Sequence, residues 1–181
     1  MNTLEKLGLK YKTDKGTKHN YLPVYFSLFS KPKEVKKVLE IGTAEGASIK
    51  MWHDFFPNAK IYGADIDEKR VEILNYLALT KSRIQGIQCD QSKAEDLLDL
   101  INLTHKDLDL VVDDGSHDRD HQIFTCQTLI PLLQKGCIYV IEDVEDGNIY
   151  AKLGITLKNI TDMKMLKLSK RYDDRLIIIK I

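Results

Sequence analysis

Short apolar runs alternate with amphipathic stretches from residue 35 onward. This alternation is typical of parallel strands joined by helices, because such strands are buried on both faces and the crossover helices cover those faces. The pattern predicts five strands, at Lys37–Ile41, Lys60–Asp65, Ile84–Cys89, Leu108–Val112 and Cys137–Ile141. It predicts four helices between them, at Ala47–Phe56, at Asp67 to about Leu79, at Ser92–Leu100 and at about Asp118 to Gln134.

The C-terminal end of the sequence departs from this alternation. Two more strands are predicted, at roughly Met163–Leu168 and Leu176–Ile181, and only the charged turn 170–175 separates them. A link this short permits only an antiparallel pair. The predicted fold is therefore α/β, a doubly wound, Rossmann-like, seven-stranded sheet that is mostly parallel and ends in an antiparallel hairpin. A dinucleotide dehydrogenase usually continues with parallel strands instead.

Composition limits the organisation and the partners. The 181 residues suit a single domain, with residues 1–34 as an N-terminal arm or lid and residues 35–181 as the core. Basic and acidic residues number 27 each, so the positive field of a nucleic-acid binder is missing. Three cysteines without C-x-x-C spacing indicate reduced thiols, and neither a signal peptide nor a membrane span is recognisable. We expect a cytoplasmic protein that does not bind a membrane or a nucleic acid.

Carboxylates follow two of the predicted strands. Asp113 and Asp114 end the strand at Leu108–Val112, and Glu142 and Asp143 end the next one. Because the carboxyl ends of parallel strands meet at one edge of a sheet, we expect Asp114, Glu142 and Asp143 to converge as oxygen ligands for Mg²⁺ or Mn²⁺. His117 is a candidate general base beside that cation. Asp113 is open to a second interpretation, as support for Asp114 or as a helix cap.

A glycine-containing loop follows the first predicted strand. Gly42 and Gly46 form G-x-x-x-G, whereas a pyrophosphate-binding loop would need G-x-G-x-x-G. Glu40 and Glu45 add negative charge there, so the loop suits a zwitterionic or cationic ligand. Asp65 ends the second strand, where a ribose diol would bind. Asp90 ends the third, either as an acceptor for an adenine amino group or as a turn residue.

These features resemble the class I S-adenosylmethionine-dependent methyltransferases over residues 37–181. The resemblance implies that the segment from Glu40 to Gly46, which includes Gly42 and Thr43, lines the methionine part of S-adenosylmethionine. It also implies that Asp65 binds the ribose and that Asp90 binds the adenine. Asp113 is counted with these cofactor-binding residues.

A narrower resemblance is carried by Asp114-Gly115-Ser116-His117, by Glu142-Asp143 and by the N-terminal run Thr13 to Tyr21. Together these are similar to the metal-dependent sugar O-methyltransferases, the group allied to macrocin O-methyltransferase and the cephalosporin hydroxylases. The resemblance implies that Asp114, Glu142 and Asp143 hold magnesium, and that His117 is the general base, with Asp114 the second catalytic residue.

The N-terminal run has two interpretations. Asp14, Lys15, His19 and Tyr21 could belong to a lid over cofactor and acceptor, where the lysines would meet a phosphate of a nucleotide-linked sugar. The alternative is the solvated face of a packing helix. Only this arm and a brief connection at residues 146–158 are available to enclose an acceptor, so we hypothesise a homo-oligomer.

The sequence thus predicts an S-adenosylmethionine-dependent, divalent-metal-assisted O-methyltransferase acting on a hydroxyl of a sugar or related small molecule. Two alternatives remain open. One is a methyltransferase of another small acceptor, such as a phenol, an acid or a phosphorylated compound. The other is a non-catalytic subunit that binds the cofactor.

Overall fold

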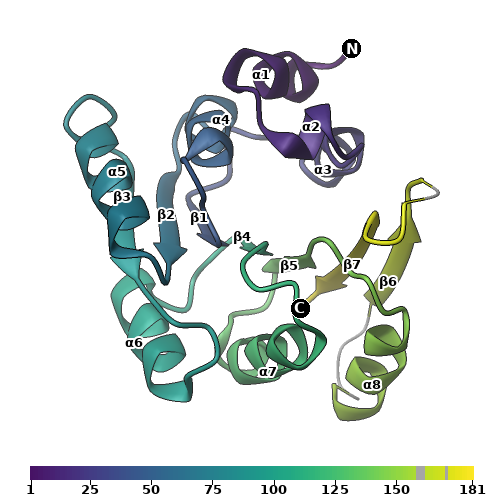
Figure 1. Ribbon diagram of the computed structural model, residues 1–181. Coiled ribbons are helices and arrows are strands. Elements are labelled where there is room, and N and C mark those ends of the chain that lie inside the picture. The colour runs from purple at the N-terminus through teal and green to yellow at the C-terminus, as the bar shows by residue number, and fades with distance from the viewer. Residues whose placement is uncertain (158–161, 170) are drawn as a thin grey trace.

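The protein is described by a computed structural model, which covers residues 1–157, 162–169 and 171–181. It contains a seven-stranded sheet in the order β3-β2-β1-β4-β5-β7-β6 (Figure 1). The strands are β1 (Lys37–Ile41), β2 (Lys60–Asp65), β3 (Ile84–Gln88), β4 (Leu110–Asp113), β5 (Ile138–Ile141), β6 (Asp162–Lys167) and β7 (Arg175–Lys180). The first five are parallel, and β7 runs antiparallel to both β5 and β6. The predicted fold class is confirmed.

Helices cover both faces of the sheet (Figure 1). They are α1 (Thr3–Tyr11), α2 (Asp14–Thr17), α3 (Leu22–Leu28), α4 (Ala47–Phe55), α5 (Glu68–Ala78), α6 (Ala94–Thr104), α7 (Arg119–Leu129) and α8 (Asn148–Thr156). Successive strand residues point to opposite faces. Val38 belongs to a buried cluster that includes residues of α1, α3, α4 and α5, whereas Leu39 belongs to one that includes residues of α6, α7 and α8. The result is two apolar cores separated by one sheet.

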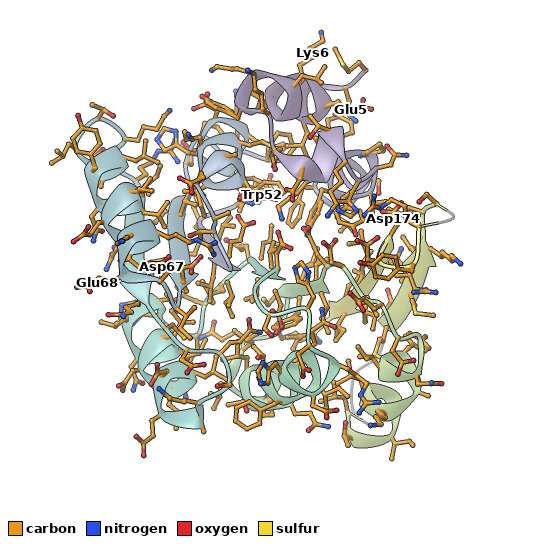
Figure 2. The ribbon with its side chains drawn as sticks, viewed as in Figure 1. Glu5, Lys6, Trp52, Asp67, Glu68 and Asp174 are labelled. Carbon is orange, nitrogen blue, oxygen red and sulfur yellow. The ribbon has the colours of Figure 1, made fainter. Side chains whose placement is uncertain are left out.

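The N-terminal segment packs on α4 instead of hanging free. Trp52 of α4 is fully buried, and its ring lies 5.0 Å from that of Tyr25 in α3 (Figure 2). Asp54, which also belongs to α4, accepts hydrogen bonds from Lys10 and Tyr11 of α1. These contacts join α1 and α3 to α4.

Several predicted boundaries differ from the structure. The helix predicted to reach Gln134 ends at Leu129 and is followed by a 3₁₀ turn at Ile130–Leu132, because Pro131 lacks the amide hydrogen that a continuing helix needs. Helix α6 begins at Ala94 and runs to Thr104, beyond the predicted Leu100. The connection predicted at 146–158 contains α8. Residues 158–161 and 170, which include its last residue and one residue of the predicted turn, lie outside the described residues.

Two further sequence expectations concern the core and the membrane. Cys89, Cys126 and Cys137 are all buried thiols, as predicted. Among the described residues, none belongs to a helix with the length and apolar character that crossing a membrane requires.

Candidate active site

A cavity of about 680 Å³ opens at the carboxyl edge of the sheet. Its wall comes from the loops after the first four strands: Gly42 to Glu45 after β1, Asp65 and Ile66 after β2, Cys89 to Ser92 after β3, and Asp114 to His117 after β4. The strand order reverses between β1 and β4, which are neighbours in the sheet. Open α/β sheets bind ligands at this kind of reversal.

Two glycines shape the loop after β1. Gly42 has φ +82°, and a Cβ built on it would lie 2.1 Å from the backbone oxygen of Asp114. A glycine is therefore required for the β1 loop to approach the β4 loop so closely. Gly46 has φ +71° and precedes the first residue of α4. It shapes the turn and is not part of the cavity wall, where the sequence placed it.

Asp65 joins the first two loops. Its Oδ2 accepts a hydrogen bond from the backbone N–H of Thr43 at 2.8 Å, and its Oδ1 accepts one from the N–H of Asp67 at 3.1 Å. The side chain lines the cavity at the end of β2, the position predicted for a ribose contact. Thr43 lines the cavity beside it.

The structure corrects the expectation that Glu40 and Asp113 contact the cofactor directly. Glu40 is fully buried, and its Oε2 accepts a hydrogen bond from Trp52 Nε1 at 2.8 Å. Asp113 is also fully buried and accepts hydrogen bonds from Gln91 and Tyr139. Burial raises the pKa of Asp113 to about 7. Both residues lie on strands of the sheet, where their carboxylates are engaged by the protein, and neither lines the cavity.

The loop after β3 contributes two cavity residues. Asp90 lines the cavity, and its Oδ1 also accepts hydrogen bonds from the backbone N–H and hydroxyl of Ser92, so both interpretations of Asp90 have structural support. Gln91 was not predicted. Its Oε1 accepts the N–H of Ser116 at 2.5 Å and thereby ties the β3 loop to the β4 loop. Its position directly after Asp90 was the available signal.

Asp114, His117 and Asp143 form a cluster at the end of the cavity. Each offers a ligand atom within 4.8 Å of the others. His117 Nε2 lies 3.5 Å from Asp114 Oδ1, and His117 Nδ1 lies 3.8 Å from Asp143 Oδ2. The hydrogen bond with Asp114 raises the pKa of His117 above its usual value. The His117 side chain is 42% exposed, so a ligand in the cavity can reach it.

Glu142 is not a member of this group of three, but it lies close to Asp114 because both acids bind the same ammonium group. It is buried, its Oε1 accepts the hydroxyl of Tyr25 at 2.5 Å, and its Oε2 accepts Lys15 Nζ at 2.8 Å. Lys15 also donates to Asp114 Oδ2 at 2.6 Å and so links the two acids. Burial raises the pKa of Glu142 well above its usual value, against the opposing charge of Lys15.

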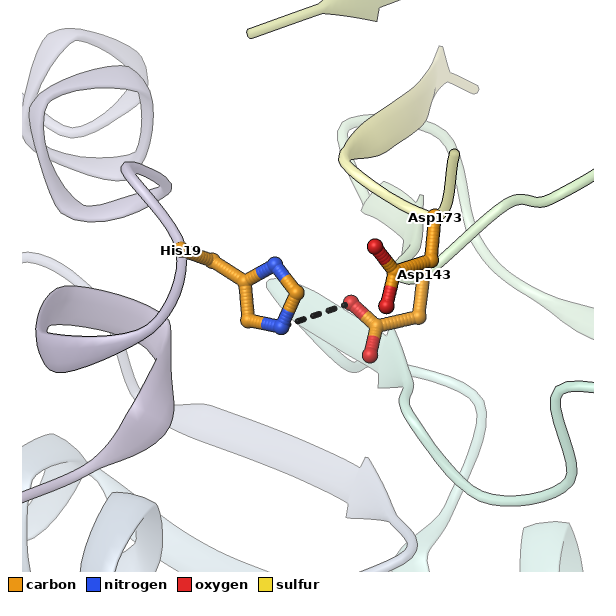
Figure 3. Close-up of side chains that lie close together, drawn as sticks. All are labelled: His19, Asp143 and Asp173. Atoms are coloured by element: carbon orange, nitrogen blue, oxygen red, sulfur yellow. Dashed lines mark ion pairs between the residues drawn. The ribbon is translucent and has the colours of Figure 1, made fainter. Parts of the chain in front are cut away.

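Two residues of the N-terminal run, His19 and Tyr21, contact acids at this edge of the sheet. The Tyr21 hydroxyl donates to Asp143 Oδ1 at 2.6 Å, and the rings of Tyr21 and His19 stack with centroids 4.7 Å apart. His19 Nδ1 lies 3.1 Å from Asp174 Oδ1. Its Nε2 lies 3.6 Å from Asp143 Oδ1, the ion pair drawn in Figure 3.

Asp173 completes a second group with His19 and Asp143 whose candidate ligand atoms lie within 4.8 Å (Figure 3). The Asp173 carboxylate is already held by Arg171, whose Nε and Nη2 lie 3.0 and 2.8 Å from its two oxygens. We therefore assign this group to the network that holds Asp143.

Lys15 is the largest departure from the predicted lid. Its side chain is only 1% exposed, so it does not meet a phosphate of an acceptor in this structure. Burial alone would lower the pKa of Lys15, but Asp114, Glu142 and Glu40 outweigh it and hold the pKa well above the usual value. Of the four N-terminal residues singled out in the sequence, Asp14 lines the cavity, together with its neighbours Lys12 and Thr13.

Known proteins resemble this chain in sequence and in fold. A family described as a methyltransferase domain matches residues 39–144. A mycinamicin VI 2''-O-methyltransferase of Micromonospora griseorubida is 38% identical over 151 residues, which are 78% of this chain and 36% of that protein. The chain belongs to this methyltransferase family. A tetracenomycin rhamnosyl 3'-O-methyltransferase of Streptomyces olivaceus is 33% identical to this methyltransferase domain, over 78% of the chain and 36% of that protein.

A solved methyltransferase structure has the same fold as this chain. The MycE methyltransferase of the mycinamycin biosynthetic pathway, in complex with Mg and SAH, superposes on this methyltransferase domain with a TM-score of 0.77 at 28% identity. The match covers 99% of this chain and 54% of that one. This methyltransferase domain thus spans little more than a third of the length of the curated relatives it matches.

Proposed function

We propose that this domain transfers a methyl group from S-adenosylmethionine to a hydroxyl group of a sugar, assisted by Mg²⁺ or Mn²⁺. The observation that carries the proposal is that one cavity contains both parts of the site. Its wall runs from Thr43 and Asp65, at the predicted cofactor end, to Asp114 and His117, at the acid cluster. Relatives named as O-methyltransferases of rhamnosyl and olivosyl compounds support it.

The cavity wall suits S-adenosylmethionine. This cofactor carries a sulfonium, an ammonium and a carboxylate, and the wall offers acids (Asp14, Glu45, Asp65, Asp90 and Asp114) together with Lys12 and Arg70. We assign Asp65 to the ribose hydroxyls, since a carboxylate at the end of the second strand takes this role in Rossmann-like folds. Asp90 and the neighbouring Gln91 would face the adenine.

The donor set suits a hard divalent cation. Asp114 and Asp143 offer carboxylate oxygens, and within the described part of the chain their group of three includes one imidazole, that of His117, and no thiolate. We propose these two acids as ligands, and Glu142 as a third that would have to turn from Lys15 or Tyr25. When bound, the cation would supply Lewis acidity toward the acceptor hydroxyl. Mycinamycin-pathway MycE has been solved with Mg and SAH.

His117 would act as the base. One ring nitrogen accepts the hydroxyl proton, while Asp114 or Asp143 stabilises the resulting imidazolium through the other. Asp114 would thus serve both the cation and the base. Placing the hydroxyl oxygen in line with the methyl group supplies further acceleration by proximity.

The acceptor and the assembly belong to the same proposal. We propose a sugar or a nucleotide-linked sugar as the acceptor, because the Streptomyces olivaceus relative is named for methylation of a rhamnosyl tetracenomycin. The acid cluster lies at an open cavity, so a second copy of the chain could complete the acceptor pocket. Three buried thiols support a cytoplasmic location.

The test combines metal removal with one substitution. Transfer to rhamnosyl and other glycoside acceptors is measured with labelled S-adenosylmethionine, with Mg²⁺ and with excess chelator. We expect Asp114→Ala to lower the rate by at least about a hundredfold, because Lewis-acid stabilisation contributes several kcal/mol. Its affinity for S-adenosylhomocysteine should stay near that of the wild type. Asp99→Ala, on the exposed side of α6, is the matched control. Equal transfer in excess chelator would exclude the metal-assisted reaction.

A further inference from the structure

Lys15 brings an ammonium group into the interior of the domain, next to acids from three strands. Its Nζ lies 2.6 Å from Asp114 Oδ2, 2.8 Å from Glu142 Oε2 and 3.0 Å from Glu40 Oε1. Glu40 belongs to β1, Asp114 follows β4 and Glu142 follows β5. The contacts to Asp114 and Glu142 are hydrogen bonds, whereas the contact to Glu40 is an ion pair without hydrogen-bond geometry.

The second oxygen of each acid has a different neighbour. Glu40 Oε2 accepts Trp52, and Glu142 Oε1 accepts Tyr25. Asp114 Oδ1 instead lies 3.5 Å from His117, at the cavity. Because Lys15 occupies Oδ2, it leaves Oδ1 as the oxygen that Asp114 presents to the acid cluster. A carboxylate that can accept at either oxygen is fixed in one orientation by this bond.

Resting on the function proposed above, we propose that Lys15 is a positioning residue for the cation site. It holds Asp114 so that Oδ1 faces His117 and Asp143, and it keeps Glu142 next to Asp114 although the two acids follow different strands. Lys15 itself does not contact the cofactor or the acceptor. Lys15 therefore acts on the reaction through the acids and not through a phosphate.

The experiment measures Mn²⁺ affinity by electron paramagnetic resonance, with S-adenosylhomocysteine saturating, in the wild type, Lys15→Met and Lys31→Met. Lys31 is an exposed lysine paired with Glu34 and serves as the control. We expect Lys15→Met to weaken Mn²⁺ binding by about tenfold or more, the size seen when outer-shell partners are removed. Affinity for S-adenosylhomocysteine, measured by calorimetry, should change by less than about threefold. Unchanged or tighter Mn²⁺ binding would overturn the proposal, because an ammonium that only competes with the cation would give that result.

A second variant separates position from charge. Lys15→Met leaves Glu40, Asp114 and Glu142 without the ammonium that they share and could fail to fold, whereas Lys15→Met with Glu40→Gln removes one positive and one negative charge. The glutamine can still accept the Trp52 hydrogen bond at its amide oxygen. We expect this double variant to melt near the wild-type temperature and still to bind Mn²⁺ weakly. Wild-type Mn²⁺ affinity in the double variant would show that Lys15 only balances charge and would overturn the proposal.

The outcomes for the two proposals can be told apart. If the wild-type protein binds S-adenosylhomocysteine but no Mn²⁺, the proposed metal-assisted function is wrong, and so is the proposed role of Lys15. If the wild-type protein binds Mn²⁺ and both Lys15 variants bind it with the same affinity, only the proposed role of Lys15 is wrong.

Discussion

Gly42→Ala tests the close contact between the cofactor loop and the Asp114 loop. A Cβ at residue 42 would lie 2.1 Å from the Asp114 backbone oxygen, and ordinary contact begins at 3.4 Å, so the loops must separate by about 1.3 Å, the difference between the two. Overpacking costs about 1–3 kcal/mol, and a left-handed backbone at a non-glycine residue costs about 1–2 kcal/mol. We expect a loss of about 2–5 kcal/mol, a large part of the roughly 5–15 kcal/mol that stabilises a typical domain.

Gly136→Ala is the matched control for that variant. Gly136 also has a positive φ, +102°, but a Cβ added there would meet nothing within 4 Å, so only the backbone cost applies. Urea denaturation gives the free energy of unfolding of both variants, and calorimetry gives their affinity for S-adenosylhomocysteine. Gly42→Ala should be the less stable and should also bind the ligand more weakly, because its loop lines the cavity. Equal stability of the two variants, with wild-type ligand affinity, would refute the close contact.

Two further predictions concern single carboxylates. Asp65→Ala should weaken S-adenosylhomocysteine binding by about tenfold or more while leaving Mn²⁺ binding intact, since Asp65 is the ribose candidate; unchanged ligand affinity in calorimetry would contradict this. Burial opposes ionisation of Asp54, but four hydrogen bonds, of which that from Tyr11 is the strongest, lower its pKa below the usual value. Its ionised form therefore stabilises the fold above the unfolded pKa of about 3.9, and that contribution disappears as the pH falls through the lower, folded value. Asp54→Asn should cost about 1 kcal/mol at neutral pH, and denaturation at about pH 3 should show a smaller difference; a constant difference would contradict the pKa shift.

Strands β1, β4, β5 and β7 were predictable because each is a short, largely apolar run, whereas β3 and β6 mix apolar and polar residues. The bounds of β1 and β2 coincide with the predicted ranges. Helices were harder to predict where the spacing of apolar residues was irregular. Helix α8 was missed because its short apolar face is interrupted by Lys152 and Gly154. A packing helix was one of two interpretations of the N-terminal run, and the sequence could not decide between them because the burial of these helices depends on α4, which is distant in sequence.

The site was predictable to the level of the backbone. Acids that follow adjacent parallel strands had to meet at one edge, and Asp114, Asp143 and His117 do so. The direction of a side chain was not encoded in that argument, so the sequence did not show that Tyr25 and Lys15 bind the two oxygens of Glu142. The partner of Glu142 was also out of reach, because Lys15 lies 127 positions away in the sequence.

The charges around Lys15 suggest why a divalent cation suits this domain. Glu40, Asp114 and Glu142 surround one ammonium, so the ionised group carries two more negative than positive charges. Burial raises the pKa of Glu40 and of Glu142, because the charged form of each acid is disfavoured away from water. A divalent cation at Asp114 would offset that charge. Its binding would then stabilise both the ionised acids and the folded domain, since a ligand that binds only the native state shifts the folding equilibrium toward it.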